Sequence, residues 1–186
     1  MNKSKPETCE VAEIIYEKPL SGDFEELLFG SDLGNTLWVK FSDKDGINEW
    51  VGKFGVGGRG SGRIIKILEP DRFFISAGGF AYVIDATARK LVWRYCEEDV
   101  LDMVYDVQKN LAIAADYTKL HWINQENKVL AVKDVAVDGI RDLKIEGRIL
   151  SGLAYKNYGD EKEQKFWLDL DKLKILRWEK PWWKFW

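Results

Sequence analysis

The sequence is poor in the residue types that build disulfide frameworks and metal sites. Its 186 residues include only two cysteines, Cys9 and Cys96, and one histidine, His121. Two cysteines are too few for a disulfide framework, and these two are not spaced as metal ligands. A single histidine excludes a histidine-rich zinc site and makes any Ser-His-Asp triad depend on His121. We therefore expect no metal and no cofactor. A reduced, cytoplasmic setting fits best, although a mature secreted chain without its signal would look the same.

Long apolar runs and an excess of positive charge are also lacking. No stretch approaches the ~18 apolar residues of a membrane helix. The first twenty residues hold Glu7, Glu10, Glu13 and Glu17 instead of a signal-peptide core. The formal net charge of −3 argues against a broad electrostatic grip on nucleic acid. The length and the 46% of apolar residues predict one soluble domain, residues 1–186, with a sizeable core.

The sequence does have nine tryptophans and many short apolar bursts that are separated by turn residues. The bursts are rich in Val, Ile, Leu and aromatic residues, which is typical of strands. They recur in four groups of four, and the groups end at Trp50, Trp93, Ala131 and Trp178, roughly 40 residues apart. The predicted repeats span residues 11–54, 63–97, 102–134 and 140–178, and an aromatic tail at 179–186 follows.

A repeat of roughly 40 residues with four short strands is typical of a β-propeller blade. One four-stranded blade cannot bury both of its faces, so blades stack and bulky side chains fill the gaps between them. We therefore predict an all-β fold of four repeats, each with about four short antiparallel strands. A small four-bladed propeller is our first interpretation. The alternatives are an open stack of sheets and two chains that complete a larger ring.

Residues 78–95 resemble the blade repeat of quinoprotein-type propellers. In that repeat a strand ending in Asp leads through a Thr-Gly turn to a strand ending in Trp. Asp85, Thr87 and Trp93 match the pattern, whereas Ala88 stands where the family usually has Gly. The other three repeats match more loosely. The resemblance implies the propeller fold, but the calcium-binding and catalytic residues of quinoprotein dehydrogenases have no counterpart here. Related propellers with this repeat are binding scaffolds.

A glycine-rich stretch contains a literal G-x-G-x-x-G at Gly55, Gly57 and Gly60. In a dinucleotide site a helix follows such glycines, and its N-terminus meets the pyrophosphate. Here the next residues have strand character, so we interpret the stretch as a connection between repeats. Its Arg59 and Arg63 are candidate partner contacts, because a glycine-rich backbone can adapt to a binding surface.

Three motifs that could carry chemistry have simpler structural interpretations. Asp169 and Asp171 could lie on one face of a strand, as the carboxylates of a glycosidase might, but they fit a blade edge and turn better. Residues 43–46, DKDG, lack the later ligands of a calcium loop and are more simply a hairpin turn. We expect His121 to be a packed or surface residue and not a catalytic one.

Two features are candidate partner-binding surfaces. The stretch 96–107 holds five carboxylates and no Lys or Arg, so it either steers a basic partner or is a solvated loop. The tryptophan-rich tail, if exposed, would anchor a partner or a homodimer; if packed, it would seal the seam between the last and first blades. The candidate residues are Glu97, Glu98, Asp99, Asp102 and Asp106 in the acidic run, and Trp182, Trp183 and Trp186 in the tail.

These observations predict a non-catalytic protein-binding scaffold with a basic protein partner. Many bacterial toxin-neutralising (immunity) proteins are small, acidic and cytoplasmic in the same way, so a basic toxin domain is the most specific candidate partner. The alternative is a carbohydrate-active propeller enzyme whose paired carboxylates meet in a central cleft. RNA binding through the aromatic tail is a weaker third class, and no membrane contact is expected.

Overall fold

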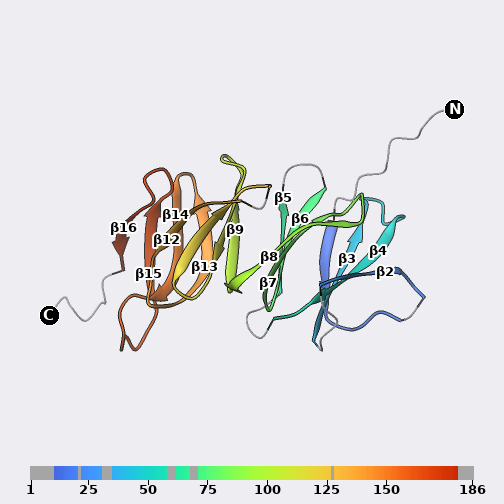
Figure 1. Cartoon of the computed structure of the whole chain (residues 1–186), viewed down its shortest axis with the longest axis horizontal. Coiled ribbons are helices and arrows are strands. Elements are labelled where there is room, and N and C mark those ends of the chain that lie inside the picture. Colours follow the sequence, from blue (N-terminus) through green and yellow to red (C-terminus); the bar gives the residue numbers. More distant parts are fainter. Residues whose placement is uncertain are drawn as a thin grey trace. The chain divides into compact units, whose positions relative to one another are not determined.

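In the computed structural model of the chain, the described residues form sixteen strands. The structure describes residues 11–20, 22–30, 35–57, 62–67, 71–126 and 128–179, with the backbone alone at 66, 67 and 95–98. Within these ranges there is no helix, and the strands form four sheets of four (Figure 1). The prediction of an all-β fold with four groups of four strands is therefore confirmed.

Sheet A departs from the simple antiparallel pattern. It contains β1 (Val11–Ile15), β2 (Glu25–Phe29), β3 (Thr36–Ser42) and β4 (Glu49–Gly55). The spatial order is β1-β3-β4-β2, and β2 runs parallel to β4 while the other two pairs are antiparallel. Residues 16–24 are long enough to carry the chain across the sheet. Packing explains this placement of β2, because Leu27 and Phe29 thereby reach the core of the sheet pair.

The other three sheets follow the order of the chain. Sheet B contains β5 (Arg63–Ile67), β6 (Arg72–Ala77), β7 (Gly79–Asp85) and β8 (Lys90–Val100). Sheet C contains β9 (Asp102–Asp106), β10 (Leu111–Ala115), β11 (Lys119–Ile123) and β12 (Val129–Asp134). Sheet D contains β13 (Asp138–Glu146), β14 (Ile149–Tyr155), β15 (Gln164–Asp169) and β16 (Lys174–Trp178).

The chain divides into two compact units, residues 1–97 and 98–186. In unit 1, sheets A and B pack face to face around aromatic rings. The buried residues of this core include Val39, Phe41, Trp50 and Phe54 from sheet A and Phe73, Ile75, Tyr82 and Ile84 from sheet B. The Tyr82 hydroxyl donates a hydrogen bond of 2.7 Å to the Gly55 carbonyl, which ties β7 to β4.

In unit 2, sheets C and D pack around mainly aliphatic side chains. Ile113, Leu120 and Trp122 come from sheet C, and Leu143, Leu150, Phe166 and Leu168 come from sheet D. Strand β9 lies beside β13 in this unit (Figure 1). Trp50 and Trp178, which end two of the predicted repeats, pack into or against the cores of their own units, as expected for bulky residues between blades.

Candidate functional site

The predicted acidic run lies on the end of β8 and on β9. Glu97 and Glu98 belong to β8, where the backbone alone is described, and Asp99 is half-buried. Asp102 and Asp106 stand at the two ends of β9 and are only 5% and 4% exposed. The expectation of five solvated carboxylates is therefore wrong for Asp102 and Asp106, because both point into the protein and are held there by main-chain donors.

Asp102 joins sheet C to sheet D. Its Oδ1 accepts the backbone N–H of Met103 at 2.7 Å, and its Oδ2 accepts the backbone N–H of Leu143 on β13 at 2.8 Å. An ionised acceptor makes stronger hydrogen bonds than a neutral one. Buried main-chain N–H groups need such a partner where no β-ladder supplies one. The contacts of Asp102 are therefore those of a structural residue.

Asp106 starts the tight turn between β9 and β10. Its Oδ1 accepts the backbone N–H groups of Gln108 and Lys109 at 3.0 and 3.1 Å. Asn110, the fourth residue after Asp106, has a φ of 55°, a left-handed conformation that asparagine tolerates better than most residues. The carboxylate and the left-handed residue together let the chain reverse direction within a few residues.

The same turn follows β7 and β15. Asp85 accepts the N–H of Ala88 at 2.8 Å, and Asp169 accepts the N–H groups of Asp171 and Lys172 at 2.9 and 3.0 Å. The fourth residue after each aspartate again has a positive φ, 51° at Arg89 and 49° at Leu173. The aspartate of the repeat pattern thus fixes a turn.

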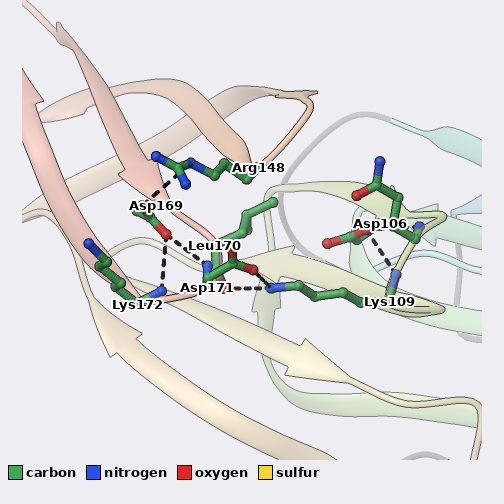
Figure 2. Close-up of polar contacts among 8 residues, drawn as sticks. Asp106, Lys109, Arg148, Asp169, Leu170, Asp171 and Lys172 are labelled. Carbon is green, nitrogen blue, oxygen red and sulfur yellow. Dashed lines mark hydrogen bonds and ion pairs between the residues drawn. The ribbon is translucent and has the colours of Figure 1, made fainter.

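Lys109 links two of these turns in unit 2 (Figure 2). Its Nζ donates to the carbonyl of Leu170 at 2.8 Å and lies 2.7 Å from Oδ1 of Asp171. On the other side, Arg148 Nε lies 3.9 Å from Oδ2 of Asp169. The side chains of Lys109 and Asp171 are 35% and 56% exposed, so solvent screens this ion pair and it contributes little stability.

The Asp169–Asp171 pair is poorly suited to glycoside hydrolysis. The backbone N–H groups of Lys172 and then Asp171 hold the pKa of Asp169 below its ordinary value of 3.8, and the charge of Arg148 acts in the same direction. The general acid of a glycosidase needs a raised pKa instead. Asp171 is meanwhile paired with Lys109. The Asp169 carboxylate holds the turn, and Asp171 lies within that turn, which was the preferred interpretation of this motif.

The DKDG motif also forms a turn, between β3 and β4. Asp43 accepts the backbone N–H groups of Ile47 at 2.9 Å and of Asn48 at 3.2 Å, and the Asn48 side-chain amide at 2.8 Å. The hydrogen bond from the Asn48 side chain is the largest of the effects that lower the pKa of Asp43. The carboxylate therefore holds the hairpin, as expected from the sequence.

His121 forms a buried pair that sequence reasoning missed. Its Nε2 lies 2.6 Å from Oδ2 of Asp116, and the two side chains are 5% and 6% exposed. The other oxygen of Asp116 accepts the N–H groups of Thr118 and Lys119 at 2.6 and 2.7 Å. The burial of both side chains keeps a dissolved substrate away from the pair. The Asp-x-Thr spacing, which Asp85 and Thr87 also have, was the signal that could have identified Asp116.

The glycine-rich stretch connects sheets A and B. The chain continues from it into β5, which begins at Arg63, so a strand follows where a dinucleotide site needs a helix. A Cβ atom on Gly57 would lie 2.2 Å from the carbonyl oxygen of Gly78, and this close backbone approach explains the glycine there. Arg63 is half-buried. Arg59 lies outside the described residues.

The tail residues Trp182, Trp183 and Trp186 also lie outside the described part of the chain. Within the described part, no group of three or more His, Cys, Asp or Glu residues is placed to hold a metal ion. Among the same residues, no helix has the length and apolar character of a membrane span.

By sequence, the chain matches no protein family and no curated protein. Its fold does match solved structures. For the Pan2 WD40 domain of Neurospora crassa the TM-score is 0.54 at 9% identity, over 77% of this chain and 48% of that one. For a protein of unknown function from Bacteroides caccae the TM-score is 0.55 at 12% identity, over 77% and 59%.

A chain of the mitotic checkpoint complex matches with a TM-score of 0.56 at 9% identity, over 77% of this chain and 47% of that one. This chain thus spans about half the length of the structures that it matches. At such low identity the likeness shows the fold alone. The fold is propeller-like: its sheets of four short strands are similar to those of the Pan2 WD40 domain and of the checkpoint-complex chain.

Proposed function

We propose that this chain is a non-catalytic protein-binding scaffold. The observation that carries the proposal is the use of its buried carboxylates. Asp102, Asp106, Asp116 and Asp169 are at most 5% exposed, and each accepts main-chain N–H groups. Acidic groups that hold the fold in this way are poor candidates for general acid or base catalysis. Function then rests on the exposed surface of the propeller-like fold.

We further propose that the blades are of the quinoprotein type, which includes pure binding scaffolds. The contacts of the repeat at 78–95 support this. Asp85 fixes the turn, and Thr87 Oγ1 donates to Oδ2 of Asp71 at 2.7 Å. Trp93 is 9% exposed and packs edge-on against Phe74, with ring centroids 5.5 Å apart. Each residue of the repeat pattern thus has a defined structural role.

The partner that we propose is a basic protein, and the most specific candidate is a toxin domain that this chain neutralises in the cytoplasm. The candidate contacts in the acidic run are now Glu97, Glu98 and the half-buried Asp99, because Asp102 and Asp106 are buried and stabilise the fold. Three acidic residues in a row along the sequence would accelerate the encounter with a basic surface more than they would strengthen the complex.

The experiment is a capture from the native host with the wild-type chain and with the triple variant Glu97→Gln, Glu98→Gln, Asp99→Asn. We expect wild type to retain a basic protein and to associate with it about tenfold faster than the variant at low salt, with a smaller change in dissociation. Salt above ~0.15 M should reduce the wild-type association rate, because the Debye length there is about 8 Å.

The matched control is Glu126→Gln, Asp134→Asn, Asp138→Asn, which changes the net charge equally at exposed positions of unit 2. It should associate as fast as wild type. Equal association rates for wild type and the Glu97/Glu98/Asp99 variant at low salt would contradict the acidic-run contact. Capture of no protein by any of the three would contradict the scaffold proposal itself.

A further inference from the structure

The sequence contains two aspartate–glycine pairs, Asp45–Gly46 and Asp138–Gly139, and no asparagine–glycine pair. Such a pair is chemically labile, because glycine has no side chain that would shield its main-chain nitrogen from the carboxyl group of the preceding aspartate. The nitrogen can attack that carboxyl group, which as a close neighbour in the same chain has a high effective concentration. Whether the attack occurs in the folded protein depends on where each pair lies.

Asp45 and Gly46 lie in the exposed turn between β3 and β4. The surroundings of Gly46 are open, because a Cβ atom built there would have a single neighbour within 4 Å, the Oε1 atom of Glu49 at 3.8 Å. No hydrogen bond or ion pair joins the Asp45 carboxylate to another residue in the described part of the chain. The side chain of Asp45 can therefore rotate toward the Gly46 nitrogen.

Asp138 and Gly139 lie at the start of β13, where the main chain is held. Asp138 is exposed, but it is aligned with Tyr155 in the ladder, and the preceding N–H of Val137 donates to the Tyr155 carbonyl at 2.9 Å. A Cβ atom built on Gly139 would lie 3.4 Å from the Tyr155 ring. Attack on the carboxyl group requires the main chain to rotate between aspartate and glycine, and a paired strand resists this rotation.

Asp43 holds the turn around Asp45 in one conformation. Its main-chain carbonyl accepts the N–H of Gly46 at 3.2 Å, and its carboxylate accepts the N–H groups of Ile47 and Asn48 at 2.9 and 3.2 Å. The nitrogen that would attack Asp45 is thus already a donor, so the turn must open first. Hydrogen bonds to a carboxylate are stronger than those to a neutral acceptor, and they make this opening rare.

We propose that Asp45 is a modification site: it is converted to isoaspartate in the folded protein, and Asp43 sets the rate of the conversion. The Gly46 nitrogen forms a bond to Cγ of Asp45, and one carboxylate oxygen leaves as water with the amide proton and one proton from solvent. Water then adds to this succinimide ring, and a proton is released. Breaking the new bond to Cγ restores aspartate, whereas breaking the original peptide bond leaves the main chain running through Cγ.

Isoaspartate has the mass of aspartate but a different main chain. The chain gains one methylene group before Gly46, and the former main-chain carbonyl group becomes a free carboxylate. The hydrogen bond from Gly46 to the Asp43 carbonyl then loses its geometry. Because the turn is exposed, the core at Phe41 and Trp50 does not have to move, so the altered chain stays folded. This inference does not depend on the partner proposed above.

Ageing of the full chain at neutral pH and physiological temperature tests the proposal. Samples taken over several weeks are digested, and chromatography separates the isoaspartate peptide from the aspartate peptide of the same mass. We expect isoaspartate to form at Asp45 about tenfold faster than at Asp138, because the turn opens more readily than the strand. In concentrated urea the two pairs should react at similar rates, since only their neighbours in the sequence then matter.

Substitution of Asp43 tests its control of the rate. Asp43→Ala should raise the rate at Asp45 about tenfold, up to the rate in urea, because opening the turn no longer breaks charge-assisted hydrogen bonds. Asp43→Asn keeps one acceptor oxygen, so its rate should lie between those of wild type and Asp43→Ala. The matched control Asp134→Ala removes an exposed carboxylate of unit 2 and should leave the rate unchanged. Asp45→Glu should abolish the new peptide, because its longer side chain cannot form the five-membered ring.

Thermal unfolding checks that each variant is folded, and hydrogen exchange at the Ile47 amide reports the opening of the turn. Absence of isoaspartate at Asp45 after several weeks overturns the proposal. So does its formation at Asp138 as fast as at Asp45 in the folded wild type. Equal rates at Asp45 in wild type and in the folded Asp43 variants overturn the control by Asp43.

Discussion

The cores of the two units use different side chains to hold a pair of sheets together. In unit 1 the aromatic rings touch one another: Trp50 stacks on Phe41 with centroids 4.2 Å apart, and Phe29 stacks on Phe54 at 5.1 Å. In unit 2 the buried cluster is mostly Leu, Ile, Val and Ala. That unit also holds all of the described residues with buried carboxylates, namely Asp102, Asp106, Asp116 and Asp169.

The difference shows two solutions to one physical problem. Two stacked sheets must exclude water between them and must satisfy the main-chain groups at their turns and edges. Large rings fill the space in unit 1, where Ser76 is buried and the neutral Tyr82 hydroxyl connects the two sheets through the Gly55 carbonyl. Smaller aliphatic side chains fill unit 2, where the carboxylate of Asp102 makes a connection between the sheets.

The largest effect is expected from truncating the aromatic core. Trp50 is 1% exposed, so Trp50→Ala should lower the free energy of unfolding by about 3–5 kcal/mol. Leu150→Ala in unit 2 should cost less, because no aromatic stacking, worth about 0.5–1.5 kcal/mol per pair, is lost with it. Urea unfolding measures both. The control Ile47→Ala, at a residue that is 76% exposed, should change stability by less than about 0.5 kcal/mol. If Leu150→Ala lowered the free energy of unfolding more than Trp50→Ala, the aromatic core of unit 1 would not be the more sensitive of the two cores.

A smaller effect is expected from the polar connection in unit 2. Asp102→Ala leaves the buried N–H groups of Met103 and Leu143 without their carboxylate acceptors, which should cost about 2–4 kcal/mol. Ser76→Ala in unit 1 should be nearly neutral, because the buried Ser76 hydroxyl has no hydrogen-bond partner among the described residues. Asp102→Asn keeps one acceptor oxygen, so its loss of stability should lie between those of Asp102→Ala and Ser76→Ala. Urea unfolding gives the free energies, and faster hydrogen exchange at the Leu143 amide should accompany the loss. Unchanged exchange there would contradict the sheet-connecting role of Asp102.

The smallest effect is expected from lowering the pH, which should open two of the turns locally. The pKa of Asp169 in unit 2 is lowered mainly by the Lys172 N–H, and that of Asp43 in unit 1 mainly by the Asn48 side chain. A lowered folded-state pKa contributes stability above the ordinary value of 3.8, and this contribution is lost as the pH falls through the folded value. Hydrogen exchange between about pH 2 and pH 5 should therefore show both turns opening.

The two turns should also be separable. Asp169→Asn should remove the acid response of the β15–β16 turn only, and Asp43→Asn that of the β3–β4 turn only. Asp45→Asn, an exposed neighbour, is the control for unit 1 and should leave both responses unchanged. An acid response at the β15–β16 turn that persists in Asp169→Asn would assign it to another group.

The sequence predicted those parts of the fold that depend on neighbouring residues. Alternating apolar bursts bounded by turn residues indicated the strands, because side chains alternate between the two faces of a strand. The turns at Asp43 and Asp169 were also predicted, because an aspartate bonds to main-chain N–H groups two to five residues later in the chain. These signals are local, so they can be read without knowing the tertiary structure.

The tertiary structure decided whatever depends on distant partners. The carboxylate of Asp102 was expected in solvent, as charged side chains usually are, but it accepts from Leu143, 41 residues away. Strand β2 lies parallel to β4 because Phe29 packs on Phe54 in that position. The pattern of residues along β2 does not predict this pairing. Alternation along a strand says which residues share a face. Which face is buried, and against which strand, is set by the packing energy of residues far apart in the chain.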